Sequence, residues 1–410
     1  MGTHEGRNVF VDGALPGERV RVKVRREGRV LRGELLAVVA PSPDRRTPAC
    51  PIWEQCGGCD WLHLQEPAQR AAREKIVRSA LEHLGGIGAE DALEERPTRT
   101  VEPAMGYRRR ATLHAGRGAL GFHGRRSHQL VPVDRCPALV TAAQGLPGEL
   151  GRALLPILRD LSEVILLESG GSWSFSARVR TGLRPRHRTV VEAAVESTGA
   201  RGAVLLAFRN APLVIGDPVL REQAPLAPGV TLRLRPDAFA QAHGPANHAL
   251  AEVVVDLCGL QPRDRLLELY SGNGNLTFAL ARAVREVVAV ESNGVALDLA
   301  RASADEGSVA NVRFVLGDAR KVAPGLVRGK ERFDVIVADP PRTGARGIDA
   351  WADLLGARRV VYVACDPASL ARDAREMKKQ GFVPRVVQQV DMFPQTHHGE
   401  TVVSFERAGR

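Results

Sequence analysis

Short apolar runs alternate with helical segments from residue 250 to the end of the chain. The apolar runs predict buried strands. They cover residues 265–270, 286–291, 312–317, 333–339, 359–365, 382–390 and 401–406. Buried strands separated by helices are the mark of a doubly wound parallel sheet, so this part is predicted to be an α/β, Rossmann-like domain.

The first 40 residues have a different pattern, in which apolar and polar positions alternate with a period of two. The period is clearest at Arg19-Val20-Arg21-Val22-Lys23-Val24-Arg25, where valines face one way and cations the other. Turn residues on both sides predict a small OB-like β-barrel over residues 1–42. Cations on one face with no acid between them suit a phosphate backbone, whereas the simpler alternative is a solvated outer face.

The middle of the chain carries weaker signals. Residues 67–84 have helical spacing of Ala, Ile, Val and Leu, which predicts a helix used for packing. From 107 to about 235, short strands alternate with glycine turns and basic clusters, which predicts a mainly β, antiparallel region. The chain is therefore predicted to divide at 1–42, 43–235 and 236–410.

Composition adds two expectations to this picture, the chemical class of the partner and the cellular compartment. The 410 residues carry a formal net charge of +10 with a pI near 9.8, which favours a polyanionic partner such as RNA. Arginine-rich proteins from high-GC genomes are also basic, so charge alone does not decide this. There is no apolar run of the roughly 18 residues that span a bilayer, and no signal-peptide pattern. We expect a soluble cytoplasmic protein with reduced thiols and no membrane association.

Three cysteines fall within ten residues, at Cys50, Cys56 and Cys59, and Cys136 follows much later. Gly57 and Gly58 let the backbone turn tightly, so these thiols are predicted to reach one metal centre. Zinc and an iron-sulfur cluster both accept such ligands, and spacing alone leaves the choice open. A disulfide is disfavoured in a cytosolic protein.

The first predicted strand of the α/β domain runs into Ser271-Gly272-Asn273-Gly274-Asn275, where glycines let the backbone pass close to a ligand. Glu291 ends the next strand and can accept hydrogen bonds from ribose hydroxyls. Asp318 follows the third strand, where it could hold an adenine amine. A full Gly-x-Gly-x-x-Gly is missing, so S-adenosylmethionine is favoured over NAD.

Asp339 and Cys365 follow two further strands, so both are predicted to lie outside the carboxyl edge of the sheet with the glycine loop. Glu400 comes 35 residues after Cys365 in His-Gly-Glu-Thr-Val. A thiol nucleophile and a carboxylate base are what is needed to alkylate an unactivated ring carbon. The simpler alternatives are a rigid turn at Asp-Pro-Pro and a buried small residue at 365.

Three segments resemble one family over nearly the whole chain. They are Phe-Val-Asp-Gly-Ala-Leu-Pro-Gly-Glu at 10–18, Cys-Gly-Gly-Cys at 56–59 and Met-Phe-Pro-Gln-Thr-His-His-Gly-Glu-Thr-Val at 392–402. The chain resembles the RNA uracil-C5 methyltransferases, most closely the large-subunit rRNA enzymes with an N-terminal TRAM domain and a [4Fe-4S] cluster.

The resemblance implies a role for each candidate residue. The cluster ligands would be Cys50, Cys56, Cys59 and Cys136. Cys365 would be the nucleophile and Glu400 the base. The S-adenosylmethionine and uracil pocket would be lined by Gln241, Tyr270, Asn275, Glu291, Asp318 and Asp339. The chain departs from the family pattern at Glu268, Ser271 and His243.

The implied reaction starts with addition of the Cys365 thiolate to C6 of a flipped uridine, and a lowered thiol pKa is expected to favour it. Carbon 5 then takes the methyl group, and Glu400 removes the C5 proton. Ribosomal RNA is the expected substrate, with transfer RNA as the alternative, and no obligate protein partner is inferred. A cytosine-C5 enzyme, a non-catalytic RNA-binding or assembly factor and a metal-thiolate oxidoreductase are the rival interpretations.

Overall fold

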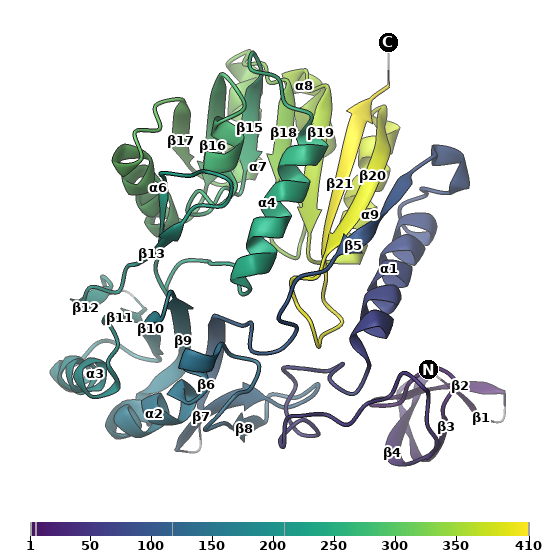
Figure 1. Cartoon of the computed structure of the whole chain (residues 1–410), viewed down its shortest axis with the longest axis vertical. Coiled ribbons are helices and arrows are strands. Elements are labelled where there is room, and N and C mark those ends of the chain that lie inside the picture. The colour runs from purple at the N-terminus through teal and green to yellow at the C-terminus, as the bar shows by residue number, and fades with distance from the viewer. Residues whose placement is uncertain (1, 5, 117, 209, 409–410) are drawn as a thin grey trace.

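The computed structural model describes residues 2–4, 6–116, 118–208 and 210–408. Three sheets follow one another along the chain: a four-stranded sheet at the N-terminus, a seven-stranded sheet in the middle and an eight-stranded sheet in the C-terminal half (Figure 1). A hairpin of β13 (Leu220–Gln223) and β14 (Thr231–Leu234) lies between the last two.

The C-terminal sheet confirms all the strands predicted for the α/β domain. In spatial order its strands are β17 (Val312–Leu316), β16 (Glu286–Glu291), β15 (Arg265–Leu269), β18 (Val335–Ala338), β19 (Arg359–Ala364), β21 (Glu400–Arg407), β20 (Phe382–Val390) and β5 (Glu94–Arg99). These strands read as apolar runs because helices cover both faces of the sheet.

The order of the strands fixes where a ligand can bind. Strands β17, β16, β15, β18 and β19 are parallel, and the chain order reverses between β15 and β18. In sheets of this kind ligands bind outside the carboxyl ends of the strands at that reversal. The last strand, β21, enters between β19 and β20 and is antiparallel to both.

Helices cover the two faces of this sheet. One face packs against α4 (Gly244–Cys258) and α5 (Thr277–Ala281). The other face packs against α7 (Ala319–Arg328), α8 (Ile348–Leu355) and α9 (Pro367–Lys379). At the β17 end, α6 (Gly294–Glu306) packs against β14, which joins the hairpin to this domain.

Helix α1 (Glu66–His83) confirms the predicted helix at 67–84, and the structure adds what it packs against. Val77 and Leu81 are buried in the C-terminal core, and the helix lies against α9. Strand β5 pairs in parallel with β20 at the edge of the same sheet. Residues 66–99 fall inside the predicted 43–235 segment but pack against the C-terminal sheet (Figure 1).

The middle sheet is antiparallel except for one pair, as the glycine turns predicted. Its strands, in spatial order, are β12 (Leu213–Gly216), β11 (Gly202–Ala207), β10 (Ser172–Val179), β9 (Leu161–Ser169), β6 (Arg110–Gly116), β7 (Ala119–His123) and β8 (Leu130–Pro132). The exception is the parallel pair of β10 and β11. Helices α2 (Leu146–Ala153) and α3 (Pro185–Thr198) contribute to its core, and the sequence pattern did not predict them.

The N-terminal sheet has the order β1 (Gly2–His4), β2 (Arg7–Val11), β4 (Val30–Ala40) and β3 (Arg19–Glu27). The predicted alternation along β3 is confirmed, because its cations are exposed and its valines are half-buried. Among the residues described, β1 and β3 are the edges of an open sheet, so these four strands do not by themselves close the predicted barrel.

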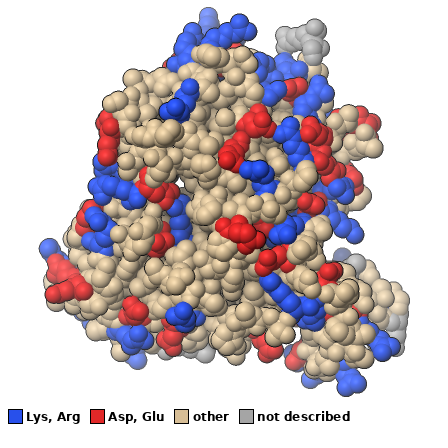
Figure 2. Space-filling model, in the orientation of Figure 1, with Lys and Arg blue, Asp and Glu red and all other residues tan. Residues whose placement is uncertain are grey.

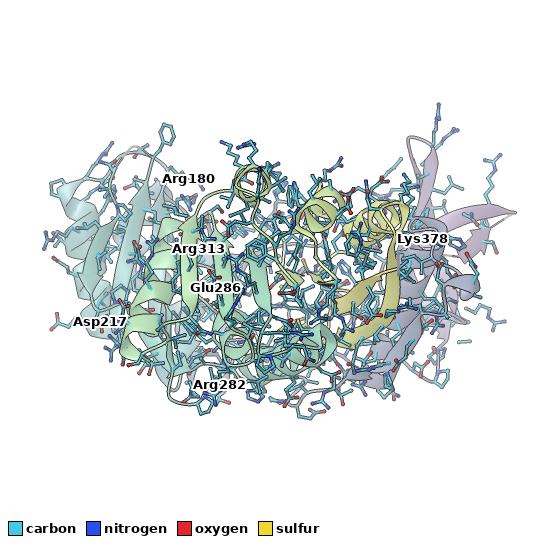
Figure 3. The ribbon with its side chains drawn as sticks, turned by 90° about the horizontal axis from the view of Figure 1, so that it is seen from above. Arg180, Asp217, Arg282, Glu286, Arg313 and Lys378 are labelled. Carbon is cyan, nitrogen blue, oxygen red and sulfur yellow. The ribbon has the colours of Figure 1, made fainter. Side chains whose placement is uncertain are left out.

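Charged side chains of both signs are spread over one face of the molecule. On the face in Figure 2, basic and acidic side chains are interleaved, so the net charge of +10 forms no single basic field there. At the amino end of the C-terminal sheet, Arg265 donates to Glu286 at 2.7 Å and Arg313 lies 3.9 Å from the same carboxylate (Figure 3). Within the described residues, none of the helices has the length and apolarity required to cross a bilayer.

We predict that α1 is needed for the stability of the C-terminal core. Leu81 is 2% exposed, so Leu81→Ala should lower the free energy of unfolding by about 2–5 kcal/mol through lost burial and a cavity. Leu84, at the end of the same helix, is 49% exposed, and Leu84→Ala should change it by less than about 0.5 kcal/mol. Urea denaturation followed by circular dichroism measures both; equal effects would contradict this packing.

Candidate active site

A cleft of about 1600 Å³ lies at the carboxyl ends of the parallel strands, where the strand order predicts a ligand. Its walls also come from the N-terminal sheet and from the turn after β7. Of the predicted site residues it is lined by Gln241, Tyr270, Glu291, Asp318, Asp339, Cys365 and Glu400. The structure therefore brings together residues that lie up to 159 positions apart, from Gln241 to Glu400.

The glycine loop after β15 is held in an unusual backbone conformation. Tyr270 has φ +65°, in the left-handed region, and turns the chain out of the strand. The Gly272 N–H donates to a Glu291 carboxylate oxygen at 2.9 Å, and the other oxygen accepts from the Asn293 N–H at 2.6 Å. Glu291 thus fixes this loop while its side chain lines the cleft.

Asp318 begins the next helix along the cleft. It is the N-cap of α7 and accepts from the Arg320 N–H at 2.9 Å. Hydrogen bonding and pairing with the Arg320 guanidinium lower the pKa of Asp318 to about 2. Its carboxylate is therefore ionised, which suits it to accept hydrogen bonds from an amine or hydroxyl of a ligand.

Two of the predicted pocket residues differ from the others in their contacts. Asn275 is not among the described residues that line the cleft; its side chain exchanges hydrogen bonds of 2.7 and 2.8 Å with Asn247 of α4. Gln241 is 6% exposed, and its carbonyl accepts from the Arg109 side chain at 2.8 Å. Asn275 therefore joins the loop to α4, while Gln241 forms part of the cleft wall.

Cys365 and Glu400 are neighbours because of the strand register. Ala364 of β19 pairs with Thr401 of the antiparallel strand β21. Cys365, which follows Ala364, therefore lies opposite Glu400, which precedes Thr401. Asp339 follows β18, the neighbour of β19 on its other side. One thiol and two carboxyl groups thus meet at the edge formed by the carboxyl ends of β18 and β19 and the amino end of β21.

The electrostatics of this group favour protonated forms. Burial raises the pKa of Cys365 to about 11, the charge of Glu400 adds to the rise, and Arg342 opposes it. Burial and the charge of Asp339 raise the pKa of Glu400 well above its usual value, again against Arg342. Burial also raises the pKa of Asp339 to about 7. The expectation of a lowered thiol pKa is therefore wrong for the free protein, because two acids and burial outweigh one cation.

Two residues at this site carried no assignment from the sequence. Arg342 lines the cleft and is the cation that favours ionisation of both Cys365 and Glu400. His398 also lines the cleft, 3.2 Å from the Arg342 guanidinium. Arg342 lies in the Asp-Pro-Pro-Arg run and His398 in the His-His-Gly-Glu run. Their positions in these motifs could have identified them as site residues from the sequence.

A second cavity, of about 300 Å³, is lined by all four predicted ligand cysteines, Cys50, Cys56, Cys59 and Cys136. None of them is in a disulfide. Burial raises the pKa of Cys59 to about 12 and also raises those of the Cys56 and Cys136 thiols, while Arg108 opposes the rise. Within the described ranges, no His, Cys, Asp and Glu side chains are grouped closely enough to hold a single metal ion.

The fold and the cleft define a Rossmann-like methyltransferase with a cysteine and an acid beside its ligand pocket. A family model described as tRNA (uracil-5-)-methyltransferase matches residues 213–408. The chain is 33% identical to the 23S rRNA (uracil(1939)-C(5))-methyltransferase RlmD of Alkalilimnicola ehrlichii, over 98% of this chain and 93% of the relative. It is also 33% identical to RlmD of Pseudomonas entomophila, over 98% and 89%. The chain belongs to the RNA uracil-C5 methyltransferases, which use S-adenosylmethionine.

A solved structure supports the fold. The crystal structure of the Pyrococcus abyssi tRNA (uracil-54, C5)-methyltransferase in complex with S-adenosyl-L-homocysteine is similar with a TM-score of 0.70. The two chains are 21% identical, and the match covers 96% of this chain and 95% of that one. The match therefore spans almost the full length of both chains.

We predict that Arg342 controls the ionisation of Cys365. Removing the cation in Arg342→Gln destabilises the thiolate, so the pKa of Cys365 rises further and alkylation at pH 8 should slow by roughly threefold to tenfold. Because the pKa is about 11 in the unaltered protein, its alkylation rate should still be rising with pH between about 7 and 9.5.

Mass spectrometry of iodoacetamide-treated protein measures the reaction at Cys365 alone. Arg346→Gln is the matched control, since Arg346 lines the same cleft, whereas Arg342 is the cation that favours the Cys365 thiolate. Equal alkylation rates in the two variants, or a rate independent of pH in this range, would contradict the prediction.

Proposed function

We propose that this chain methylates C5 of a uridine in 23S ribosomal RNA, with Cys365 as the nucleophile and Glu400 as the base. The observation that carries the proposal is the register of β19 and β21, which sets these two residues side by side in the cleft. The relatives that match nearly full length are named for uracil 1939 of 23S rRNA, which supports the equivalent nucleotide as the target.

The residues at the carboxyl ends of β15, β16 and β17 fit S-adenosylmethionine. A Cβ at Gly272 would meet nothing within 4 Å, so the glycine loop leaves open space in front of Tyr270. Glu291 and Asp318 present carboxylates at two successive strand ends. These three side chains would hold the cofactor, and Asn275 would hold the loop in place. Bound S-adenosylmethionine supplies an electrophilic methyl group.

Gln241 and Asp339 are assigned to the uracil side of the cleft. Gln241 has amide donors and an acceptor for the edge of the base. Asp339, with a pKa near 7, can present either a proton or a lone pair. A uridine that is stacked or paired in RNA has to be swung out of its helix before its base can enter a pocket of this kind.

Cys365 and Glu400 perform the two proton-dependent steps. The Cys365 thiol loses its proton and its sulfur bonds to C6, which leaves C5 electron-rich enough to take a methyl group. Cys365 lies just before Asp366, the N-cap of α9, whose N-terminus favours the thiolate, and the Arg342 guanidinium favours it as well. Glu400, made more basic by burial, then takes the C5 proton, the C5–C6 double bond re-forms and the sulfur leaves.

A [4Fe-4S] cluster is proposed for the cysteine cavity. Four thiols line one space of about 300 Å³, and the Arg108 guanidinium offsets part of the negative charge that thiolate ligands bring. Zinc ribbons usually supply two close pairs of cysteines, whereas here three cysteines lie within ten residues and the fourth follows much later, which favours the cluster over zinc. The role that fits this place is structural, because the four cysteines line this cavity and not the cleft that contains Cys365 and Glu400.

The remaining assignments follow from this function. The segment at 1–42 would be a TRAM-type module that holds RNA through its exposed cations, with the central region at 43–235 and the catalytic domain at 236–410 completing the cleft. An enzyme acting on ribosomal RNA would work in the cytoplasm. Transfer RNA is the second candidate, supported by the name of the family model.

A trapping experiment tests the proposal. RNA carrying 5-fluorouridine at the target position cannot lose fluorine as a proton, so with S-adenosylmethionine the methylated adduct should stay bonded to Cys365 and shift on a denaturing gel. Cys365→Ala should give no shift. Fragments of 23S rRNA and a transfer RNA transcript are compared in parallel. An adduct with transfer RNA alone would move the assignment to that substrate, and an unshifted band with both would contradict the mechanism.

We predict that Cys56→Ser removes the cluster. The purified variant should lose the brown colour and the iron content of the protein, and RNA binding should weaken because the cysteine segment borders the cleft. Cys258 is buried in α4 away from the cavity, so Cys258→Ala should keep the brown colour, the iron content and RNA binding. Full methylation by a protein without iron would show that the cluster has no part in function.

A further inference from the structure

The catalytic carboxylate is placed by a loop whose partners come from the other end of the chain. This segment, residues 391–399, joins β20 to β21 and ends at Glu400; we name it the base loop. In Figure 1 it leaves the sheet and runs down beside the N-terminal end of α1. Its polar partners include Arg46, Asp60, Trp61, Gln69, Arg73, Ala104 and Tyr107.

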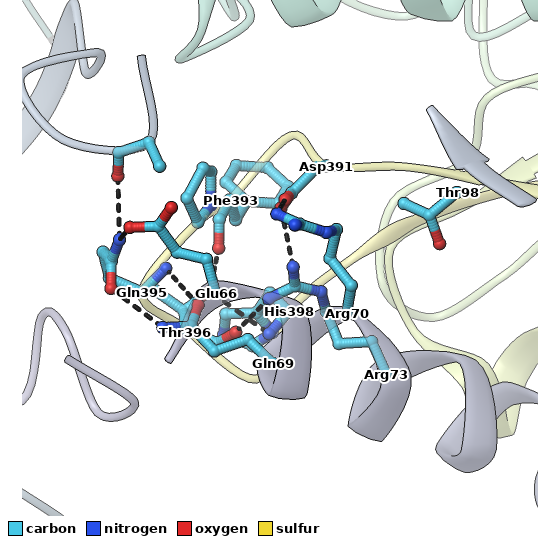
Figure 4. Close-up of polar contacts among 12 residues, drawn as sticks. Glu66, Gln69, Arg70, Arg73, Thr98, Asp391, Phe393, Gln395, Thr396 and His398 are labelled. Atoms are coloured by element: carbon cyan, nitrogen blue, oxygen red, sulfur yellow. Dashed lines mark hydrogen bonds and ion pairs between the residues drawn. The ribbon is translucent and has the colours of Figure 1, made fainter. Parts of the chain in front are cut away.

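Helix α1 supplies the buried part of this support (Figure 4). The Gln69 side chain accepts from the Gln395 N–H at 2.8 Å and donates to its side-chain oxygen at 2.9 Å. Arg73 donates to the Thr396 carbonyl at 2.9 Å and to Asp391 at 2.7 Å. Both α1 residues are at most 3% exposed. These contacts fix the start and the middle of the base loop as part of the protein core.

The cysteine segment, residues 50–64, supports the same loop from a second side. The Trp61 N–H donates to the Gln395 carbonyl at 2.9 Å. Asp60, directly after Cys59, accepts from the His397 N–H at 3.3 Å and lies 2.7 Å from its Nδ1. Asp60 therefore binds both the backbone and the ring of a residue three positions before Glu400.

The contact continues toward the reacting groups. The His397 and His398 rings lie 3.9 Å apart, and His398 lies 3.2 Å from Arg342. Arg342 in turn favours the ionised forms of both Cys365 and Glu400. A displacement of His397 would thus reach Glu400 along the backbone, whereas Arg342 follows β18 and is not part of the base loop.

We propose that Asp60 is a positioning residue through which the cysteine segment sets the place of Glu400. This inference rests on the proposed function and deepens it, because it gives the cysteine segment a part in the last step of the reaction. Loss of the Asp60 contact should slow removal of the C5 proton and leave formation of the S–C6 bond nearly unchanged. Cys365 follows β19 and does not depend on the base loop for its position.

The pair suits such a test because it is partly exposed. The side chains of Asp60 and His397 are 33% and 55% exposed, and pairs of this kind contribute little to global stability. The Asp60→Ala protein should therefore fold, held by the buried Gln69 and Arg73 contacts.

The experiment follows the covalent intermediate with natural uridine RNA and S-adenosylmethionine. In Asp60→Ala the fraction of enzyme bonded to methylated RNA on a denaturing gel should rise about tenfold, because the C5 proton leaves slowly and the S–C6 bond persists. The rate of adduct formation should stay within about twofold of the unaltered enzyme. Asp60→Asn, which keeps one acceptor for His397, should lie between the two.

Controls separate this inference from the proposed function. Glu400→Gln removes the base itself and should accumulate the same adduct; its failure to do so would overturn the proposed role of Glu400. Asp44→Ala changes an exposed acid near the start of the cysteine segment and should behave as the unaltered enzyme. If Glu400→Gln accumulates adduct and Asp60→Ala does not, or if Asp60→Ala slows both steps equally, the inference about Asp60 is wrong.

Two further measurements test the same inference, and the first of them requires no RNA. Hydrogen exchange of the base-loop amides in RNA-free protein should be faster in Asp60→Ala, with the iron content unchanged. Combining Asp60→Ala with His397→Ala should add little to the adduct produced by either change alone, because both remove the same contact. Unchanged exchange, or additive effects on the adduct, would also overturn the inference.

Discussion

The pairing of β19 with β21 is the constraint on which the site depends. Ala364 opposite Thr401 puts a thiol and a carboxylate at one level, although 35 positions separate them in the chain. Side chains alternate between the faces of a strand, so a slip of one residue would turn Glu400 to the opposite face. The apolar residues of β21 hold the register because Val402 packs into the core on one face of the sheet and Val403 and Phe405 into the core on the other, so a slip would disrupt both.

Low polarity around the thiol determines how the site works. Two carboxyl groups and a thiol share a buried edge with one nearby cation, so each holds its proton more strongly than it would in water. The raised pKa lowers the fraction of Cys365 present as thiolate at neutral pH. A base made stronger by burial would suit the step proposed for Glu400, and burial likewise disfavours the Cys365 thiolate in the free protein.

The two cavities of the molecule have residues in common. Gly58, Arg108, Phe239, Gln241 and Phe393 line both the cleft and the cysteine cavity. The segment Tyr107-Arg108-Arg109 connects them further, since Tyr107 donates to the Pro394 carbonyl of the base loop and Arg109 to the Gln241 carbonyl. The central region therefore acts as a support for the catalytic edge, in addition to any contact that it makes with RNA.

The sequence by itself determined the strands of the C-terminal sheet, because strands buried on both faces appear as continuous apolar runs. It also determined the cysteine set and the convergence of Asp339 and Cys365, since carboxyl ends of parallel strands share one edge. The tertiary structure alone decided that α1 and β5 join the catalytic sheet, that Asn275 binds Asn247, and that Arg342 and His398 complete the site. It also reversed the expected direction of the thiol pKa. A local pattern reports which face of a segment is buried, whereas its partner and the charges around it are set by residues hundreds of positions away.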